Sequence, residues 1–360
     1  MQAQVRSGRS LADDAREAPR EVVVVGHGPV AVGVAAVLSA RLSARSGGVV
    51  RMLDAAPDDE PGAAFAGADA VVLASHTGDL GAALTEPSAE RRAAAVADAE
   101  RVLAGARAAR VPQVVAITSA MVHGAAPQQP PLPEDAPLIS AAEAGDGVVG
   151  DLLAVEAVLA RAARRRGGPR GTGRRPAPIG GPAVDTMLPR HFEAPRLLTV
   201  RGVEREWQFT HVDDLGSAVA LVVDQRLRGP FTVGHPDVLT AREVEAAAGM
   251  RRIELAAVTA FGTAERLHRV GALPAPAAEL AYTVYPWTVT GAGLLAAGWE
   301  PRWSAAQCVD ALLEGVQGRT ALAGRRLGAR DAAAVGAAGA AVAMIGTAAV
   351  WRRARARRRP

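Results

Sequence analysis

Six residues near the N-terminus have types and a spacing that suit the binding of phosphate groups. They fit the pattern G-x-G-x-x-G/A and are Gly26, His27, Gly28, Pro29, Val30 and Ala31. The first glycine of such a pattern permits a tight turn, the second lets the backbone approach a pyrophosphate, and the small third residue lets a helix pack against a strand. A helix that begins here also presents free N–H groups and a positive dipole end to the phosphates. The pattern therefore predicts a dinucleotide-binding site.

Asp54 is the residue that we expect to bind a ribose of the dinucleotide. It ends an apolar, strand-like segment and lies 28 residues after Gly26, a longer spacing than the usual ~20. A carboxylate at a strand end accepts hydrogen bonds from both ribose hydroxyls and repels a 2′-phosphate. Asp54 therefore favours NAD over NADP as the cofactor. The alternative is a turn that contains two glycines, followed by an unrelated surface aspartate.

Other residues with reactive side chains give weaker signals. Ser119 has no G-x-S-x-G pattern around it, which argues against an acyl-transfer nucleophile. His76 and His123 follow strand-like segments and titrate near ~6.5 when unperturbed, so either could act as an acid or base. A structural hydrogen bond is the simpler interpretation for both. The stretch HVDD at 211–214 has too few neighbouring ligands for a metal ion, and no metal is expected.

Alternating strands and helices must position these residues. Strands are predicted at 21–26, 48–56, 68–75 and 111–120, and helices at 29–42, 89–109 and 151–165. Short, wholly apolar strands that alternate with helices are typical of a parallel sheet covered on both faces. The predicted fold class is α/β, a Rossmann doubly wound parallel sheet that spans residues 21–182. Residues 1–20 are polar and irregular and are predicted to be a disordered lead-in.

The pattern becomes irregular in the second half of the chain. The stretch GGPRGTGRRPAPIGGP at 167–182 lies where a further strand would be expected, but its residues do not predict one. Residues 183–320 are predicted to form a smaller, mixed substrate-binding region that shares part of the sheet. Within it, a strand is expected at 231–234 and helices near 241–248 and 304–317.

The composition restricts the chemistry. The 360 residues include no lysine and no asparagine, so all 41 basic residues are arginines. Six arginines lie in the last nine residues, and the rest of the chain carries 35 arginines against 37 acidic residues, which does not favour nucleic-acid binding. The single cysteine, Cys308, excludes an internal disulfide and a cysteine-rich metal site. No apolar segment follows Met1, so we predict a cytoplasmic protein without a secretory signal.

The C-terminal end could contact a membrane. Residues 332–351 carry no charge and as a helix would be about 30 Å long, enough to cross a bilayer core. The Arg-rich tail at 352–360 would then lie among anionic headgroups, which makes 332–359 a candidate membrane-associated segment. The alternative is an alanine-rich soluble helix with a solvated basic tail.

Five segments, in this order along the chain, carry a likeness to a known family. They are AFAGADAVVLAS at 64–75, ERVLAGARAARVPQVVAITSAMVHG at 100–124, Arg175-Pro176 with Gly181-Pro182, WQFTHVDDLGSAV at 207–219 and LLAAGWEPRWS at 294–304. In these segments the chain resembles the NAD-dependent epimerase/dehydratase family of extended short-chain dehydrogenases, over roughly 21–318. The resemblance implies NAD as cofactor and a nucleotide sugar or related small molecule as substrate. It also implies a catalytic role for Ser119 and cofactor contacts at Leu73, Ala74, Ser75 and Ser119.

The same resemblance implies a tyrosine, a lysine and an asparagine that are missing here. With the helix at 148–160 aligned on Glu156, the tyrosine position falls on Val148 and the lysine position on Leu152. The asparagine position falls near Ala95. The only tyrosines, Tyr282 and Tyr285, lie far along the chain. A tyrosine with a pKa of ~10 is a poor base at neutral pH unless a cation lies beside it.

Two functions follow from these observations. The first is an NAD-dependent epimerase, dehydratase or reductase, since Ser119 lies at the expected strand end. The second is a non-catalytic NAD(P)-binding sensor or scaffold, since the tyrosine, lysine and asparagine are absent. The missing residues favour the second function, whereas the resemblance as a whole favours the first.

Overall fold

The computed structural model describes residues 21–316, except 84, 165–169, 195, 271, 272 and 274, together with 321–322 and 325–326. The lead-in at 1–20 and the segments at 332–351 and 352–360 lie outside the described residues, and the expectations for them stay predictions. Within the described residues, no helix combines the length and the apolar character that a membrane span needs.

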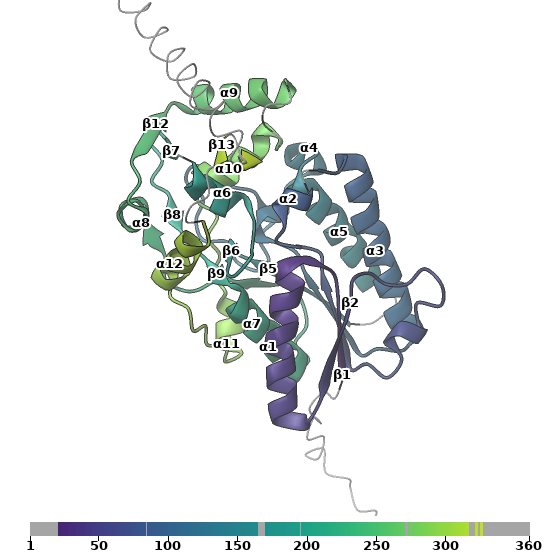
Figure 1. The fold of residues 1–360 in the computed structure, drawn as a ribbon. Coiled ribbons are helices and arrows are strands. Elements are labelled where there is room, and N and C mark those ends of the chain that lie inside the picture. Colours follow the sequence, from purple (N-terminus) through teal and green to yellow (C-terminus); the bar gives the residue numbers. More distant parts are fainter. Residues whose placement is uncertain are drawn as a thin grey trace, which may run out of the picture.

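A parallel sheet forms the centre of the fold, as predicted, and it has six strands (Figure 1). Its strands, in the order β10-β5-β4-β3-β1-β2, are β1 (Glu21–Val25), β2 (Val49–Leu53), β3 (Ala70–Ala74), β4 (Gln113–Ile117), β5 (Arg170–Pro176) and β10 (Phe231–Val233). The chain runs outward from β1 to β2 and then returns to place β3 on the other side of β1. The strand order therefore reverses between β1 and β3, where ligands bind in open α/β sheets.

Two pairs of helices cover the two faces of the sheet (Figure 1). The pairs are α1 (Gly28–Ser46) with α7 (Val212–Gln225), and α3 (Ser88–Ala108) with α5 (Val148–Ala163). The buried strand residues alternate between two apolar cores, one beneath each pair of helices. This three-layer arrangement confirms the predicted α/β class.

Local sequence explains where α1 begins and ends, and how closely it packs. Pro29 lies in its first turn, where a missing N–H costs nothing, and Gly47 ends it in the left-handed conformation with φ of 63°. A Cβ on Gly33 would lie 2.5 Å from Cγ2 of Val212 on α7. Gly33 therefore lets α1 and α7 come into close contact.

The strand that is expected within 167–182, but that the residues there do not indicate, is present as β5. Strand β5 pairs with β4 on one side and β10 on the other, deep inside the sheet. Tertiary contacts compensate for its polar residues: the Arg174 guanidinium lies 4.4 Å from the ring centroid of Phe231, and the Arg175 guanidinium binds the carboxylate of Glu156. The long aliphatic stems of these arginines take the place of apolar side chains.

The remaining elements are short, and most lie in the second half of the chain. The strands are β6 (Ile179–Gly180), β7 (Leu197–Val200), β8 (Glu206–Trp207), β9 (Thr210–His211), β11 (Leu239–Thr240), β12 (Arg252–Leu255), β13 (Ala321–Leu322) and β14 (Arg325–Arg326). The helices are α2 (Leu80–Ala83), α4 (Ala141–Ala144), α6 (Met187–Glu193), α8 (Ala241–Ala248), α9 (Ala257–Arg269), α10 (Ala281–Val284), α11 (Ala292–Ala296) and α12 (Ala305–Val316). Three 3₁₀ turns complete the set: η1 (Ala63–Phe65), η2 (Ala120–His123) and η3 (Ala277–Leu280).

Candidate functional site

A cavity of about 350 Å³ runs along the carboxyl edge of the central sheet. Gly26 after β1, Asp54 after β2, Ser75 after β3 and Ser119 after β4 all line it. The strands are parallel, so their carboxyl ends meet at one edge, and the reversal between β1 and β3 leaves a crevice there. The cavity therefore brings together the residues from four separate segments that the sequence singled out.

The two motif glycines let the loops after β1 and β3 touch. Gly26 has φ of 134° and Gly28 has φ of 84°, values that favour glycine. A Cβ on Gly26 would lie 2.9 Å from the Ala74 carbonyl oxygen, and one on Gly28 would lie 2.7 Å from the Thr77 carbonyl oxygen. Close packing between backbones thus requires glycine at both positions.

The start of α1 offers fewer free donors than the motif suggests. Pro29 has no N–H, and the N–H of Val30 donates to the Thr77 carbonyl oxygen at 3.2 Å. Of the six motif residues, Gly26 and His27 line the cavity, whereas the four at 28–31 do not. An anion at this helix end could therefore use the N–H of Val30 only if the loop around Thr77 released it.

The end of the cavity near β2 carries the predicted ribose-binding residue. Asp54 is exposed and lines the cavity together with Asp98 and Arg101. Asp98 Oδ1 accepts hydrogen bonds from the Ala56 N–H at 3.3 Å and from Arg101 Nη2 at 3.2 Å. Because Asp54 itself is exposed, its carboxylate is open to a ligand at this end.

The loop after β3 forms the middle of the cavity wall. Ala74 and Ser75 line the cavity, and Leu73 is buried in the strand behind them. Two of the three residues predicted to contact the cofactor in this segment therefore reach the cavity.

Ser119 lies at the opposite end from Asp54 and is held by the backbone. It precedes η2, and its Oγ accepts a hydrogen bond from the Met121 N–H at 3.3 Å. Val148 and Leu152, which occupy the tyrosine and lysine positions, line the same cavity, as does Ala95. The positions that would carry acid–base groups by resemblance thus present aliphatic side chains.

Tyr282 also lines the cavity, which the sequence did not predict. Its hydroxyl donates to the Met121 carbonyl oxygen at 2.8 Å, although 161 residues separate the two. Burial, followed by the charges of Glu279 and Glu143, raises the pKa of Tyr282 above its ordinary value. Tyr282 is therefore a neutral hydrogen-bond donor rather than a base. Tyr285 stacks on Phe261 and does not line the cavity.

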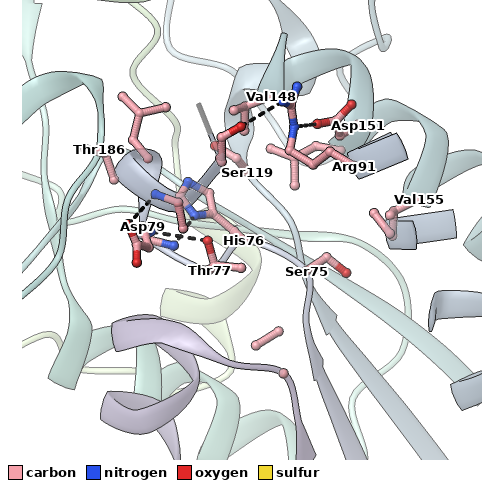
Figure 2. A pocket seen from close by; sticks show the side chains of 18 of the residues that line it. Ser75, His76, Thr77, Asp79, Arg91, Ser119, Val148, Asp151, Val155 and Thr186 are labelled. Carbon is pink, nitrogen blue, oxygen red and sulfur yellow. Dashed lines mark hydrogen bonds and ion pairs between the residues drawn. The ribbon is translucent and has the colours of Figure 1, made fainter. Parts of the chain in front are cut away.

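His76 and His123 have different surroundings. His76 lines the cavity near Ser119 (Figure 2), and its Nδ1 accepts a hydrogen bond from the Gly78 N–H at 3.2 Å. Burial lowers the pKa of His76 to about 4, against a weaker backbone effect that raises it. His123 is buried outside the cavity lining, with its Nδ1 3.0 Å from the Pro137 carbonyl oxygen. His76 is thus the histidine that can meet a ligand, and it is neutral at pH 7.

The loop that carries His76 is held against the second half of the chain. The Asp185 N–H donates to the Gly78 carbonyl oxygen at 2.6 Å, and the Leu80 N–H donates to the Asp185 carbonyl oxygen at 2.8 Å. Arg190 binds the Asp185 carboxylate through Nε and Nη2, at 3.0 and 2.6 Å. These bonds hold the loop in addition to its hydrogen bond with the start of α1.

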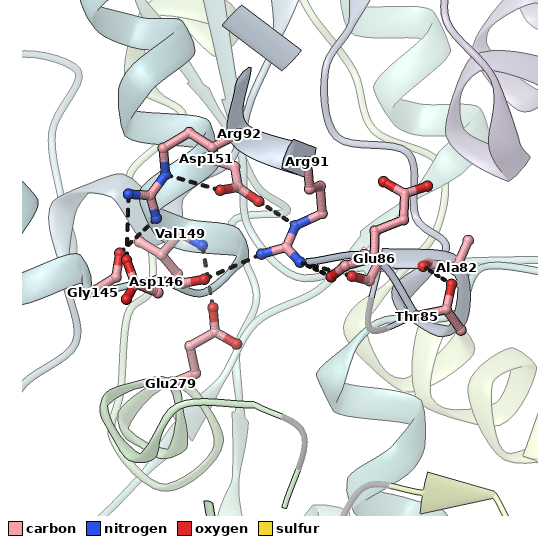
Figure 3. Close-up of polar contacts among 11 residues, drawn as sticks. Ala82, Thr85, Glu86, Arg91, Arg92, Gly145, Asp146, Val149, Asp151 and Glu279 are labelled. Carbon is pink, nitrogen blue, oxygen red and sulfur yellow. Dashed lines mark hydrogen bonds and ion pairs between the residues drawn. The ribbon is translucent and has the colours of Figure 1, made fainter. Parts of the chain in front are cut away.

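A buried charged cluster lies at the start of α5 (Figure 3). Asp151 Oδ2 accepts from Arg91 Nε, and Asp151 Oδ1 accepts from Arg92 Nε at 3.1 Å. Glu279 is 1% exposed and accepts the Val149 N–H at 3.3 Å through Oε1, with a further backbone hydrogen bond from Val148, while its Oε2 has no hydrogen-bond partner among the described residues. Burial raises the pKa of Glu279 to about 6, partly offset by backbone hydrogen bonds and the charge of Arg91.

The raised pKa of Glu279 predicts that Glu279→Gln stabilises the protein at pH 7.5. A pKa of about 6 against an ordinary 4.5 means that ionised Glu279 costs about 2 kcal/mol in the folded state. Protonated Glu279 carries no such cost, so the stability of the fold is highest below pH 4.5, and the difference is lost as the pH rises through 6. Urea unfolding should show the variant about 2 kcal/mol more stable at pH 7.5 and no more stable at pH 4.5. An equal gain at both pH values would contradict the assignment.

No group of metal-ligating side chains gathers among the residues that the structure places. In the stretch 211–214, the ring of His211 stacks on Trp303 with 3.7 Å between centroids. Asp214 accepts hydrogen bonds from the N–H groups of Arg302 and Trp303 at 2.8 and 2.9 Å. This stretch therefore anchors the segment before α12 to α7.

Comparisons with known proteins give a match at the level of structure. No model of a known protein family matches the sequence, and no curated protein matches it. A UDP-galactose 4-epimerase structure has 21% identity and a TM-score of 0.56, and the match covers 82% of this chain and 98% of that one. The UDP-glucose 4-epimerase of Thermus thermophilus, in complex with NAD, has 17% identity, coverage of 83% and 99%, and a TM-score of 0.57.

A third solved structure is similar to the chain over a comparable length. The dTDP-glucose 4,6-dehydratase DesIV from Streptomyces venezuelae, with NAD and TYD bound, has 16% identity, coverage of 82% and 97%, and a TM-score of 0.56. All three matches extend over nearly the whole length of the known enzymes. They confirm the fold that the sequence resemblance implied. The chain therefore shares the fold of nucleotide-sugar epimerases and dehydratases.

Proposed function

We propose that this chain binds NAD in the cavity at the carboxyl edge of its sheet, without the tyrosine-dependent chemistry that the resemblance implies. One observation carries the proposal. The glycine turn and Asp54 open onto the same cavity as Val148 and Leu152, which are aliphatic where the resemblance implies tyrosine and lysine. The chain is thus an NAD-binding sensor or scaffold.

The residues of the cavity suit NAD at both of its ends. Asp54 would hold the adenosine ribose, and Gly26 and His27 would lie beside the pyrophosphate. Ser75 and Ser119 would lie toward the nicotinamide. When bound, NAD would supply a hydride acceptor, while the protein would orient the dinucleotide and exclude water from it. A contact between the pyrophosphate and the N–H of Val30 would require the loop around Thr77 to release that N–H.

We expect NAD to bind more tightly than NADP, by about tenfold or more, because the Asp54 carboxylate repels a 2′-phosphate. Asp54→Ala should reduce this preference. Asp59→Ala is the matched control, since Asp59 is exposed and does not line the cavity. Isothermal titration calorimetry with both dinucleotides measures the effect. Equal or tighter binding of NADP by the unmodified chain would remove Asp54 from its assigned role.

An NAD-dependent enzyme acting on nucleotide sugars is the second candidate. It is favoured by the position of Ser119 in the cavity, together with the structural matches to epimerases and a dehydratase. Incubation with NAD and a panel of UDP- and dTDP-sugars distinguishes the two functions. We expect no turnover, because the lowered pKa of His76 makes its ring a weak base, and the raised pKa of Tyr282 keeps its hydroxyl protonated. Turnover that Ser119→Ala abolishes would establish the enzyme instead.

A further inference from the structure

The end of the cavity beyond Ser119 has a mostly apolar wall. Its side chains come from α5, α6 and the loops after β4 and α10, and they include Met121, Val148, Leu152, Leu188 and Trp287. The hydroxyl of Tyr282 is turned toward the Met121 carbonyl oxygen. This end therefore offers a large contact area to uncharged carbon groups and few polar groups.

The charged side chains around the cavity are mainly acidic. The lining includes two guanidiniums, those of Arg91 and Arg101, and six carboxylates, those of Asp54, Asp79, Glu86, Asp98, Asp151 and Asp185. Arg101 lies toward the Asp54 end, where it pairs with Asp58 and Asp98. Arg92 and Arg190, which do not line the cavity, bind Asp151 and Asp185. The carboxylates that remain still outnumber the guanidiniums, which disfavours a second anion besides the dinucleotide.

Arg91 is a cation of the cavity lining that a ligand near Ser119 could use, and four of its five N–H donors are engaged (Figure 3). Nε donates to Asp151, Nη1 to the carbonyl oxygens of Ala83 and Glu86, and Nη2 to the Asp146 carbonyl oxygen. A diphosphate is normally bound by charge-assisted bonds from free arginines, lysines or helix ends. Arg91 could offer a single N–H of Nη2, but a bidentate contact with a phosphate would have to break existing bonds.

Two polar groups of the cavity lining, on His76 and Ser119, can donate to a ligand at this end of the cavity (Figure 2). Because His76 Nδ1 accepts the Gly78 N–H, the proton of the neutral ring is on Nε2, which can donate to a ligand. The Ser119 Oγ accepts from Met121 and keeps its own proton to donate. The Thr186 hydroxyl is buried with no partner among the described residues, and such groups normally find one.

We propose that this end of the cavity binds a neutral, largely apolar molecule whose carbonyl or hydroxyl oxygen accepts a hydrogen bond from His76 Nε2 or Ser119, and not a nucleoside diphosphate sugar. The inference rests on the proposed function, since the molecule would lie beside the nicotinamide end of NAD. His76 is prepared for this role because Asp185 and Gly78 hold its loop in place. No ionisation of His76 is needed for the contact.

Two substitutions of His76 test the roles of its two ring nitrogens separately. His76→Asn keeps an acceptor for the Gly78 N–H but has no donor where Nε2 lies. His76→Gln places its amide N–H group near the Nε2 position. A change caused only by disturbing the loop would thus appear in His76→Gln at least as strongly as in His76→Asn. The pair therefore distinguishes a ligand contact from a structural role.

The experiment uses the full chain, cyclohexanone as the neutral probe and UDP-glucose as the anionic one. Saturation-transfer NMR titrations give the Kd of each probe, with and without NAD. We expect cyclohexanone to bind and UDP-glucose not to bind. His76→Asn and Ser119→Ala should each weaken cyclohexanone binding about five- to tenfold, the effect of one hydrogen bond. His76→Gln should keep the Kd within about twofold.

Tighter binding of UDP-glucose than of cyclohexanone would overturn the inference, and so would equal Kd values for the unmodified chain and both test variants. Failure of cyclohexanone to bind would overturn it as well. Calorimetry with NAD on the same samples tests the proposed function separately. Binding of NAD without cyclohexanone defeats only the inference, and binding of cyclohexanone without NAD defeats only the proposed function.

Discussion

Arg175→Met should lower the free energy of unfolding by about 3–5 kcal/mol at pH 7, because it leaves the Glu156 carboxylate buried without its counter-ion. Arg175 Nε and Nη2 donate to the two oxygens of Glu156 at 2.9 and 2.8 Å, and the Thr118 hydroxyl donates to Oε1 at 2.7 Å. Glu156 is 5% exposed. Thermal unfolding should show a fall in Tm of about 10 °C.

The pH dependence provides a further check on this pair. Burial alone would raise the pKa of Glu156, but the hydrogen bonds and charge of Arg175, with Thr118, hold it below its ordinary value. A lowered folded-state pKa means that the stabilisation is present above the ordinary pKa and is lost as the pH falls through the folded one. The difference between Arg175→Met and the unmodified chain should therefore be full at pH 7 and shrink at acidic pH.

Arg201→Met is the matched control for this prediction. The Arg201 side chain is 71% exposed, and its Nε lies 3.4 Å from Glu254, so its loss should change stability by less than about 1 kcal/mol. If Arg175→Met were no more harmful than this control, the account of how β5 enters the sheet would be wrong.

Gly28→Ala should abolish measurable NAD binding, which corresponds to an increase in Kd of about 100-fold or more. Gly28 has φ of 84°, and its added Cβ would lie 2.7 Å from the Thr77 carbonyl oxygen. The backbone at 77 would have to move, and the approach of a pyrophosphate to the turn would be blocked. Calorimetric titration with NAD measures the change.

Gly47→Ala separates this local effect from general strain. Gly47 also has a positive φ, of 63°, but its added Cβ meets nothing within 4 Å. Its replacement should cost about 1 kcal/mol of stability and leave the Kd for NAD unchanged. Retained NAD affinity in Gly28→Ala would count against the whole assignment of the glycine turn.

The elements that carry the glycine turn could be predicted from the sequence because local signals specify them. The run EVVVVG gives a buried strand that ends in a turn, and Pro29 suits the first turn of the helix that follows. Both signals lie within a few residues of the element that they define. The alternation of such elements is enough to predict a parallel sheet with helices on both faces.

Strand β5 could not be predicted in the same way, since long-range contacts stabilise it. Arg174 lies over Phe231, and Arg175 binds Glu156, partners that are distant in the chain. A window of sequence around 170–176 shows only glycines, arginines, a threonine and a proline, a composition that disfavours a strand. The pairing with β4 and β10 overrides that local preference.

Part of the candidate site could be predicted from the sequence. Strand ends of a parallel sheet meet at one edge, so Asp54 and Ser119 could be assigned to one site from their positions alone. Tyr282 carries no such signal, because it reaches the cavity through the packing of a distant segment. The contact between Thr77 and the start of α1 is also invisible in the sequence, since it involves backbone atoms.

A crystal structure of the full chain with NAD tests the central claim most directly. We predict electron density for NAD along the carboxyl ends of β2, β1, β3 and β4, with the adenosine ribose at Asp54 and the nicotinamide between Ser119 and Val148. The Thr77 carbonyl should no longer accept the N–H of Val30. Density for NAD elsewhere on the protein, or an empty cavity at millimolar NAD, would contradict the account.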